Sequence, residues 1–125
     1  MMTKYMVSVL SLLLSGCIGG PPTAAELAKA DYGSPITQQQ AELIVNQWLK
    51  SNLKDPESAK IEWGVVQKGW IREAIISGSQ LKFGYLLKAN VNAKNSFGGY
   101  TGYKACNFVF KNNQLILAEP ADIYR

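Results

Sequence analysis

The sequence contains no histidine, and this absence removes much of the chemistry that a small domain can carry. Without imidazole there is no Ser-His-Asp or Cys-His nucleophile arrangement, no histidine metal ligand and no histidine general base. The remaining carboxylates, among them Glu57, Glu62 and Glu73, form no recognisable pair. The sequence therefore predicts a protein with no catalytic residues, no metal site and no cofactor.

Cysteine is scarce, since Cys17 and Cys106 are the only two in the chain. If Cys17 is modified, Cys106 has no partner within the chain, which excludes an intramolecular disulfide framework. Cys106 alternates in phase with Phe108 and Phe110, so we expect an inert thiol on the core face of a strand. The alternative is an intermolecular disulfide, which would require an exposed thiol.

Long runs of one charge are also missing. The chain has 13 basic and 9 acidic residues, and its lysines stand singly along the sequence. A nucleic-acid site needs a basic patch or stripe, so we expect no nucleic-acid partner. The lysines are expected to form a solvated surface, with weak attraction to anionic envelope polymers as the alternative.

No apolar run is long enough to span a membrane, but a short one lies near the N-terminus. Tyr5 to Leu14 is almost unbroken in apolar character, and Lys4 precedes it with a positive charge. Ten helical residues rise about 15 Å, half of the roughly 30 Å hydrocarbon core of a bilayer. The pattern is typical of a signal peptide, which we assign to residues 1–16.

The four residues Leu14-Ser15-Gly16-Cys17 resemble the lipobox of bacterial lipoproteins. This resemblance implies cleavage before Cys17 and acylation of that cysteine. Two or more acyl chains would then hold the mature protein at a membrane. In lipoproteins of this kind, a residue such as Ile18 rather than aspartate after the cysteine implies sorting to the outer membrane. The expected location is therefore the cell envelope, facing the periplasm from the outer membrane.

After the lipobox, residues 17–35 are expected to form a flexible tether, because Gly19 to Pro22 resists regular structure. Within it, Thr23 and Glu26 have the spacing of a capping box for a short helix. A single domain should occupy residues 36–125, since the remaining length supports only one core. Its first element is an amphipathic helix capped by Thr37. Its apolar face consists of Ala41, Ile44, Val45, Trp48 and Leu49.

Beyond the helix, Asp55-Pro56-Glu57 predicts a brief helical turn, and the hydrophobic period then changes to two. Strands are expected over 59–65, with Val65 on the buried face, and over 81–93, 100–111 and 114–118. A less regular strand is expected over 70–76, before a turn at Gly78. Asn112-Asn113 should form a two-residue hairpin turn. The fold class is thus α+β, with an N-terminal amphipathic helix packed on an antiparallel sheet of about four or five strands.

The segment from Asn90 to Tyr103 is the most distinctive internal stretch, because it combines asparagine, glycine and aromatic residues. It is interpreted either as an ordinary hairpin loop or as a recognition loop that offers stacking surfaces and adaptable hydrogen bonds. Trp70 is the tryptophan most expected to be exposed, whereas Trp48 and Trp63 are expected at the core or its edge. The candidate binding residues are Asn92, Lys94, Asn95, Phe97, Tyr100, Tyr103 and Trp70.

Together with residues 53–60, this segment resembles small lipoproteins of proteobacteria and their phages that have no assigned role. The order of a helix followed by an antiparallel sheet is also similar, at fold level only, to the outer-membrane assembly lipoproteins of the SmpA/OmlA family. We therefore expect a non-enzymatic envelope lipoprotein that binds an envelope protein or peptidoglycan through its sheet edge or the 90–103 loop. The alternatives are a phage-derived surface-exclusion lipoprotein and a small periplasmic enzyme with a deep pocket.

Overall fold

The computed structural model describes residues 20–73 and 80–120 of the chain. The predicted signal peptide at 1–16, the predicted lipidation site Cys17 and the predicted turn at Gly78 lie outside these residues. Backbone proximity divides the chain into two compact units, one of residues 1–29 and 72–81 and the other of residues 30–71 and 82–125. No helix among the described residues is long and apolar enough to cross a membrane.

In the first unit, helix α2 spans Ala24–Ala28 and begins with the predicted capping box. The Glu26 amide donates to Thr23 Oγ1 at 3.1 Å, and the Thr23 amide donates to Glu26 Oε1 at 3.0 Å. Arg72 forms an ion pair with the same carboxylate at 3.2 Å. The hydrogen bond from Thr23 and the Arg72 guanidinium hold the pKa of Glu26 below its ordinary value.

In the second unit, helix α3 spans Gln38–Asn52, and its start confirms the cap that the sequence predicts. The Gln40 amide donates to the Thr37 side chain at 3.1 Å. Ala41, Val45 and Leu49 are buried on one face of the helix, as the apolar spacing predicts. The 3-10 helix η1 spans Pro56–Ser58 and follows α3 with proline in its first turn.

The sheet has five strands: β1 (Lys60–Trp63), β2 (Gln67–Arg72), β3 (Leu81–Asn92), β4 (Lys104–Lys111) and β5 (Gln114–Glu119). The strand order is β1-β3-β4-β5, and β2 also pairs with β3. The long strand β3 therefore has β4 on one edge and two short strands, β1 and β2, in succession on the other. The antiparallel sheet with its helices confirms the α+β class. The long helix is not the first in the chain, because α2 precedes α3.

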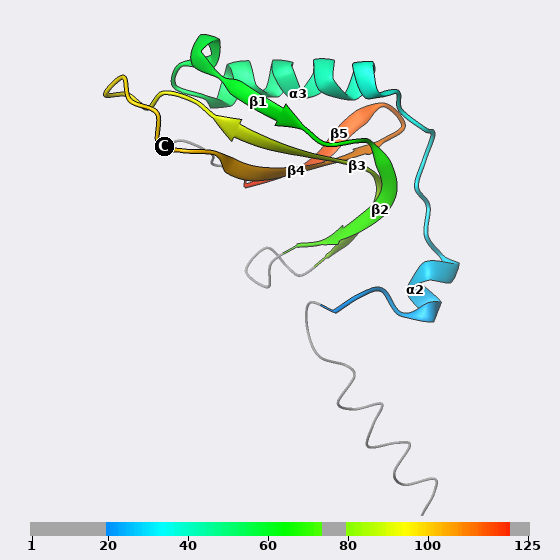
Figure 1. The fold of residues 1–125 in the computed structure, drawn as a ribbon. Coiled ribbons are helices and arrows are strands. Elements are labelled where there is room, and N and C mark those ends of the chain that lie inside the picture. The colour runs from blue at the N-terminus through cyan, green and yellow to red at the C-terminus, as the bar shows by residue number, and fades with distance from the viewer. Residues whose placement is uncertain (1–19, 74–79, 121–125) are drawn as a thin grey trace, which may run out of the picture. The chain divides into compact units, whose positions relative to one another are not determined.

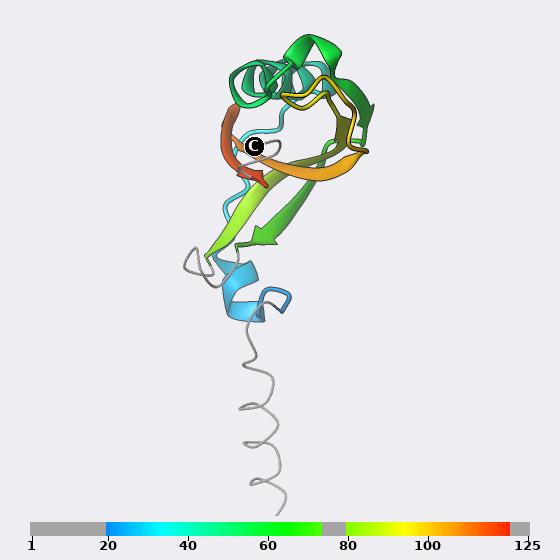
Figure 2. The ribbon, with the colours of Figure 1, turned by 90° about the vertical axis from the view of Figure 1, so that its left-hand side faces the viewer.

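Helix α3 covers one face of the sheet (Figures 1 and 2). The core lies between them, and Trp48 of α3 meets Phe108 of β4 edge to face, with ring centroids 5.4 Å apart. Burial in the second half of β3 alternates as the sequence predicts. The largest fully buried side chains are Phe108, Phe110, Leu87, Val45, Val91, Val109 and Cys106.

At the turn between β1 and β2, one burial prediction made from the alternation is wrong. Val65 was expected on the buried face but is 77% exposed, because β1 ends at Trp63 and the chain turns. The side-chain amide of Gln38 stabilises this turn by hydrogen bonding to two backbone groups. Its Nε2 donates to the Gly64 carbonyl at 2.9 Å, and its Oε1 accepts from the Val66 amide at 2.8 Å.

Strand β4 begins at Lys104 and not at Tyr100 as predicted. The residues before Lys104 form a loop because Gly102 adopts a positive φ of 104°, which interrupts an extended strand. Strand β2 begins at Gln67, earlier than expected, and residues 74–76 of its predicted range lie outside the described part.

The hairpin between β4 and β5 turns at Asn112-Asn113, as predicted, with φ angles of 52° and 65°. Gly84 lies where β3 passes close to β4. A Cβ at this position would clash with the carbonyl oxygen of Phe110 and approach Val109 Cγ1 to 2.9 Å. The close approach of the two backbones therefore requires glycine here.

Candidate functional site

The loop between β3 and β4, residues 93–103, folds around the side chain of Asn95. Asn95 Oδ1 accepts hydrogen bonds from the Phe97 amide at 2.9 Å and the Gly99 amide at 3.2 Å. The Asn95 amide donates to the Gly99 carbonyl at 2.9 Å, and the Gly98 amide donates to the Asn95 carbonyl at 3.0 Å. With Gly98 at a φ of 82°, these bonds define a tight turn of fixed shape.

Phe97 lies within this turn and is 95% exposed. It is the most exposed large hydrophobic residue in the described part of the chain. Tyr100 and Tyr103 in the same loop are 41% and 49% exposed. Three exposed aromatic residues on one short loop form a surface of the kind that proteins use for contact with other molecules.

Tyr100 interacts with three other groups. Its hydroxyl donates to the Ser58 carbonyl at 2.8 Å. Lys60 Nζ lies 4.5 Å from the centre of its ring, and Lys94 Nζ lies 5.7 Å from the same centre. These distances place both ammonium groups within the range of cation–π attraction.

Ser58 ties the loop to η1 through its hydroxyl group. The Lys94 amide donates to Ser58 Oγ at 2.9 Å, and that hydroxyl donates to the Asp55 carbonyl at 2.7 Å. Asp55 thus contributes its backbone, and its side chain makes no capping hydrogen bond. The loop is therefore supported by a segment more than 35 residues earlier in the chain.

The structure brings most of the predicted binding residues together. Asn92 Oδ1 accepts from the Gly102 amide at 3.2 Å, so Asn92 supports the far end of the loop. Trp70 does not belong to this group, because it lies on β2 and is half-buried. The expectation that Trp70 is exposed is wrong, because it is partly buried, as Trp48 and Trp63 are.

Lys60 and Lys94 form the charged part of the site. Among the described residues, neither makes an ion pair, although Glu57 and Glu62 lie close to Lys60 along the chain. Glu62 instead accepts a hydrogen bond from Asn90 at 3.4 Å. We call Lys60, Lys94, Phe97, Tyr100 and Tyr103 the aromatic-lysine site.

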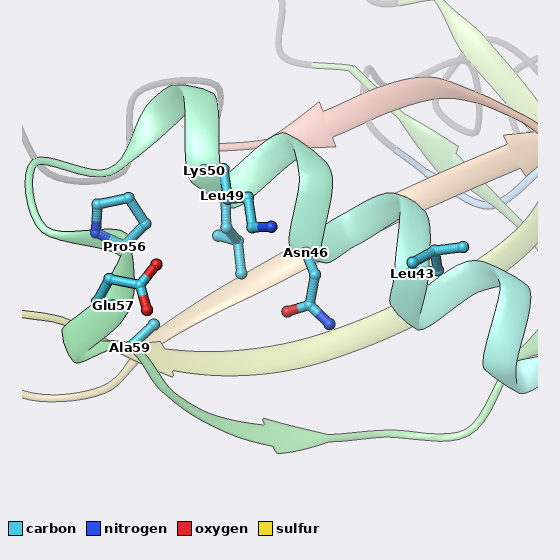
Figure 3. A pocket seen from close by; sticks show the side chains of 7 residues that line it. All are labelled: Leu43, Asn46, Leu49, Lys50, Pro56, Glu57 and Ala59. Atoms are coloured by element: carbon cyan, nitrogen blue, oxygen red, sulfur yellow. The ribbon is translucent and has the colours of Figure 1, made fainter.

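An open groove lies between η1 and α3 (Figure 3). Its volume is about 380 Å³. One wall carries the Asn46 amide and the other carries the Glu57 carboxylate, which faces the helix. The groove is lined by Leu43, Asn46, Leu49, Lys50, Pro56, Glu57 and Ala59. Its lining thus includes one carboxylate, of Glu57, and one ammonium group, of Lys50.

Cys106 lies in the core, with only 2% of its surface exposed, as its alternation with phenylalanine predicts. Burial raises the pKa of its thiol to about 11, so the thiolate is scarce at neutral pH. No group of three or more potential metal ligands occurs within residues 20–73 and 80–120. No protein family model, curated protein or solved structure matches this chain.

Two parts of the site escaped prediction from the sequence. Lys60 and Ser58 are far from the loop along the chain, and only the pairing of β1 with β3, which sets Lys60 opposite Asn92, brings them to it. The basic stretch at 74–118, with five lysines and no acidic residue, contains neither of these residues and could not have indicated them.

Proposed function

We propose that this protein is a bacterial envelope lipoprotein that acts as a binding module through the loop at residues 90–103. The lipobox-like sequence at residues 14–17, the short apolar run before it and Lys4 support lipidation at Cys17. On this proposal residues 17–35 tether the protein to the outer membrane, facing the periplasm. Helix α3 is then the first long helix of the folded domain.

The observation that carries the binding role is the fixed turn around Asn95 that exposes Phe97. Exposing a large aromatic side chain to water gains nothing for folding, so its place on a hydrogen-bonded turn favours a contact role. A turn of fixed shape also lowers the entropy lost on binding. These features favour recognition over turnover of a small molecule, which requires a concave site.

The edges of the sheet are less suited to a partner than the loop is. Strand β1 has only four residues, and Lys60 and Glu62 on it are charged and exposed. Strand β5 has an irregular register, in which Val109 pairs with Leu117 and Phe110 with Leu115, so that Ile116 is an extra residue. Short length, charge and bulges are features by which natural sheets avoid pairing with other strands.

The partner we propose is a component of the envelope, such as a membrane protein or peptidoglycan. The test is photo-crosslinking in living cells, with benzoylphenylalanine placed separately at Phe97, Tyr103, Val65 and Ile116. Val65 and Ile116 are matched controls because they are exposed apolar residues of the same unit. Adducts at positions 97 and 103 alone would support the loop as the contact surface. Equal yields at all four positions, or adducts only at 116, would contradict it.

A further inference from the structure

Phe97 and the two lysines at Tyr100 suggest which part of the envelope the loop contacts. Phe97 is 95% exposed, and no described side chain forms a pocket around it. Sites for sugars and other small ligands are concave and enclose most of the ligand. A protruding phenylalanine instead suits a soft, extended apolar phase that can surround it, such as the acyl region beneath lipid head groups.

The two charged side chains that lie over the ring of Tyr100 are both lysines. Lys94 precedes Phe97 by three residues, and Lys60 reaches the same tyrosine ring as Lys94. Neither lysine makes an ion pair with a described carboxylate, so both ammonium groups are available to an anionic surface. The 45 residues from 74 to 118 add no negative charge along the chain. Lysines near an anionic membrane each contribute about 1 kcal/mol of attraction, equal to a roughly fivefold change in affinity.

The tyrosines of the loop fit the same surface. Tyr100 and Tyr103 are about half exposed and combine an apolar ring with a hydroxyl group. Tyrosine is enriched at the level of the head groups, where one end of the side chain is apolar and the other is hydrated. The aromatic-lysine site therefore combines the three components of an interfacial contact: an apolar tip, flanking tyrosines and unpaired lysines.

We infer that the aromatic-lysine site docks on an anionic lipid surface, with Phe97 inserted among the acyl chains and Lys60 and Lys94 at the lipid phosphates. This inference rests on the proposed function, because it names the envelope component that the 90–103 loop contacts. The lipid anchor and the loop then form two separate attachments to membrane. A single weak contact becomes effective when a first attachment raises its local concentration.

The test uses the protein purified from membranes, with benzoylphenylalanine in place of Phe97, reconstituted into vesicles. One set of vesicles contains phosphatidylglycerol mixed with phosphatidylcholine, and the other contains phosphatidylcholine alone. After illumination, intact-mass spectrometry measures the fraction of protein that carries one added lipid. The same group in place of Val65, which is 77% exposed in the same unit, is the positional control.

We expect a lipid adduct at position 97 in the anionic vesicles, little in the neutral vesicles and none at position 65. Replacing both Lys60→Gln and Lys94→Gln should weaken docking about thirtyfold and remove most of the adduct. Lys50→Gln with Lys54→Gln makes the same change of charge on exposed residues outside the site and should leave the adduct unchanged.

Three results would overturn the inference: equal adducts in both kinds of vesicle, no adduct at position 97, or no effect of the Lys60 and Lys94 substitutions. The first would show insertion without recognition of charge. A loop that crosslinks to an envelope protein in cells but gives no lipid adduct in anionic vesicles would overturn membrane docking and leave the proposed binding role intact. The two proposals can therefore fail separately.

Discussion

Tyr100 and Tyr103 offer a direct way to separate the support of the loop from its contact surface. Tyr100 donates a hydrogen bond to Ser58 and lies under Lys60, whereas Tyr103 is 49% exposed on the same loop. The hydrogen bond contributes about 0.5–1 kcal/mol at so exposed a position. The cation–π contact with Lys60 contributes about 0.5–1 kcal/mol more. Tyr100→Ala should therefore lower the free energy of unfolding by about 1–2 kcal/mol.

Two companion variants make this prediction specific. Tyr100→Phe keeps the ring and loses only the hydroxyl, so it should lower the free energy of unfolding by about 0.5–1 kcal/mol. Tyr103→Ala should change it by no more than about 0.5 kcal/mol, as is usual for exposed positions. If loop contacts mediate binding, Tyr103→Ala should weaken partner capture while the fold keeps its stability.

Urea unfolding followed by tryptophan fluorescence measures these differences, since all three tryptophans lie in the second unit. With a slope of about 1.5 kcal/mol per molar urea, Tyr100→Ala should lower the midpoint by roughly 1 M. Equal destabilisation by Tyr100→Ala and Tyr103→Ala would refute the reasoning. A Tyr100→Phe variant as unstable as Tyr100→Ala would refute the cation–π part.

Three further predictions concern the fold that supports the loop. Gln38→Ala should lower the free energy of unfolding by about 1–2 kcal/mol in urea, because two backbone groups after β1 lose their partner, and an unchanged midpoint would contradict this. Gly84→Ala should cost about 1–3 kcal/mol through its clash with Phe110, whereas Gly99→Ala, with no contact closer than 4.0 Å, should cost far less. Cys106 should react with maleimide at pH 8 only after unfolding, because burial raises its pKa to about 11, and rapid labelling of the folded protein would disprove its burial.

The local signals in the sequence were sufficient for most of the second unit. The cap at Thr37, the apolar face of α3 and the hairpin at Asn112-Asn113 depend on neighbouring residues, and the structure confirms all three. The alternation of residues 87–93 also depends only on their own strand and is confirmed. Patterns with a clear period and a matching turn or cap were therefore reliable here.

The wrong prediction for Val65 and the missed grouping of the two lysines depend on contacts between distant segments. Val65 continues the alternation of β1, yet it is exposed because the strand ends before it. The chain turns there, and Gln38, which is 28 residues before Val66, holds the turn by accepting a hydrogen bond from the Val66 amide. The grouping of Lys60 with Lys94 at one ring likewise arises from the register of β1 on β3. Composition and spacing contain no direct record of such pairings.

The central claim is that a lipid-anchored envelope protein presents this loop, and the anchor is its most directly testable part. The measurement is the intact mass of the protein extracted from membranes of the producing cells, compared with the Cys17→Ala variant. The account predicts a mature chain that begins at an acylated Cys17, and an uncleaved, unmodified precursor for the variant. An unmodified full-length chain from the unaltered protein, or normal processing of the variant, would contradict it.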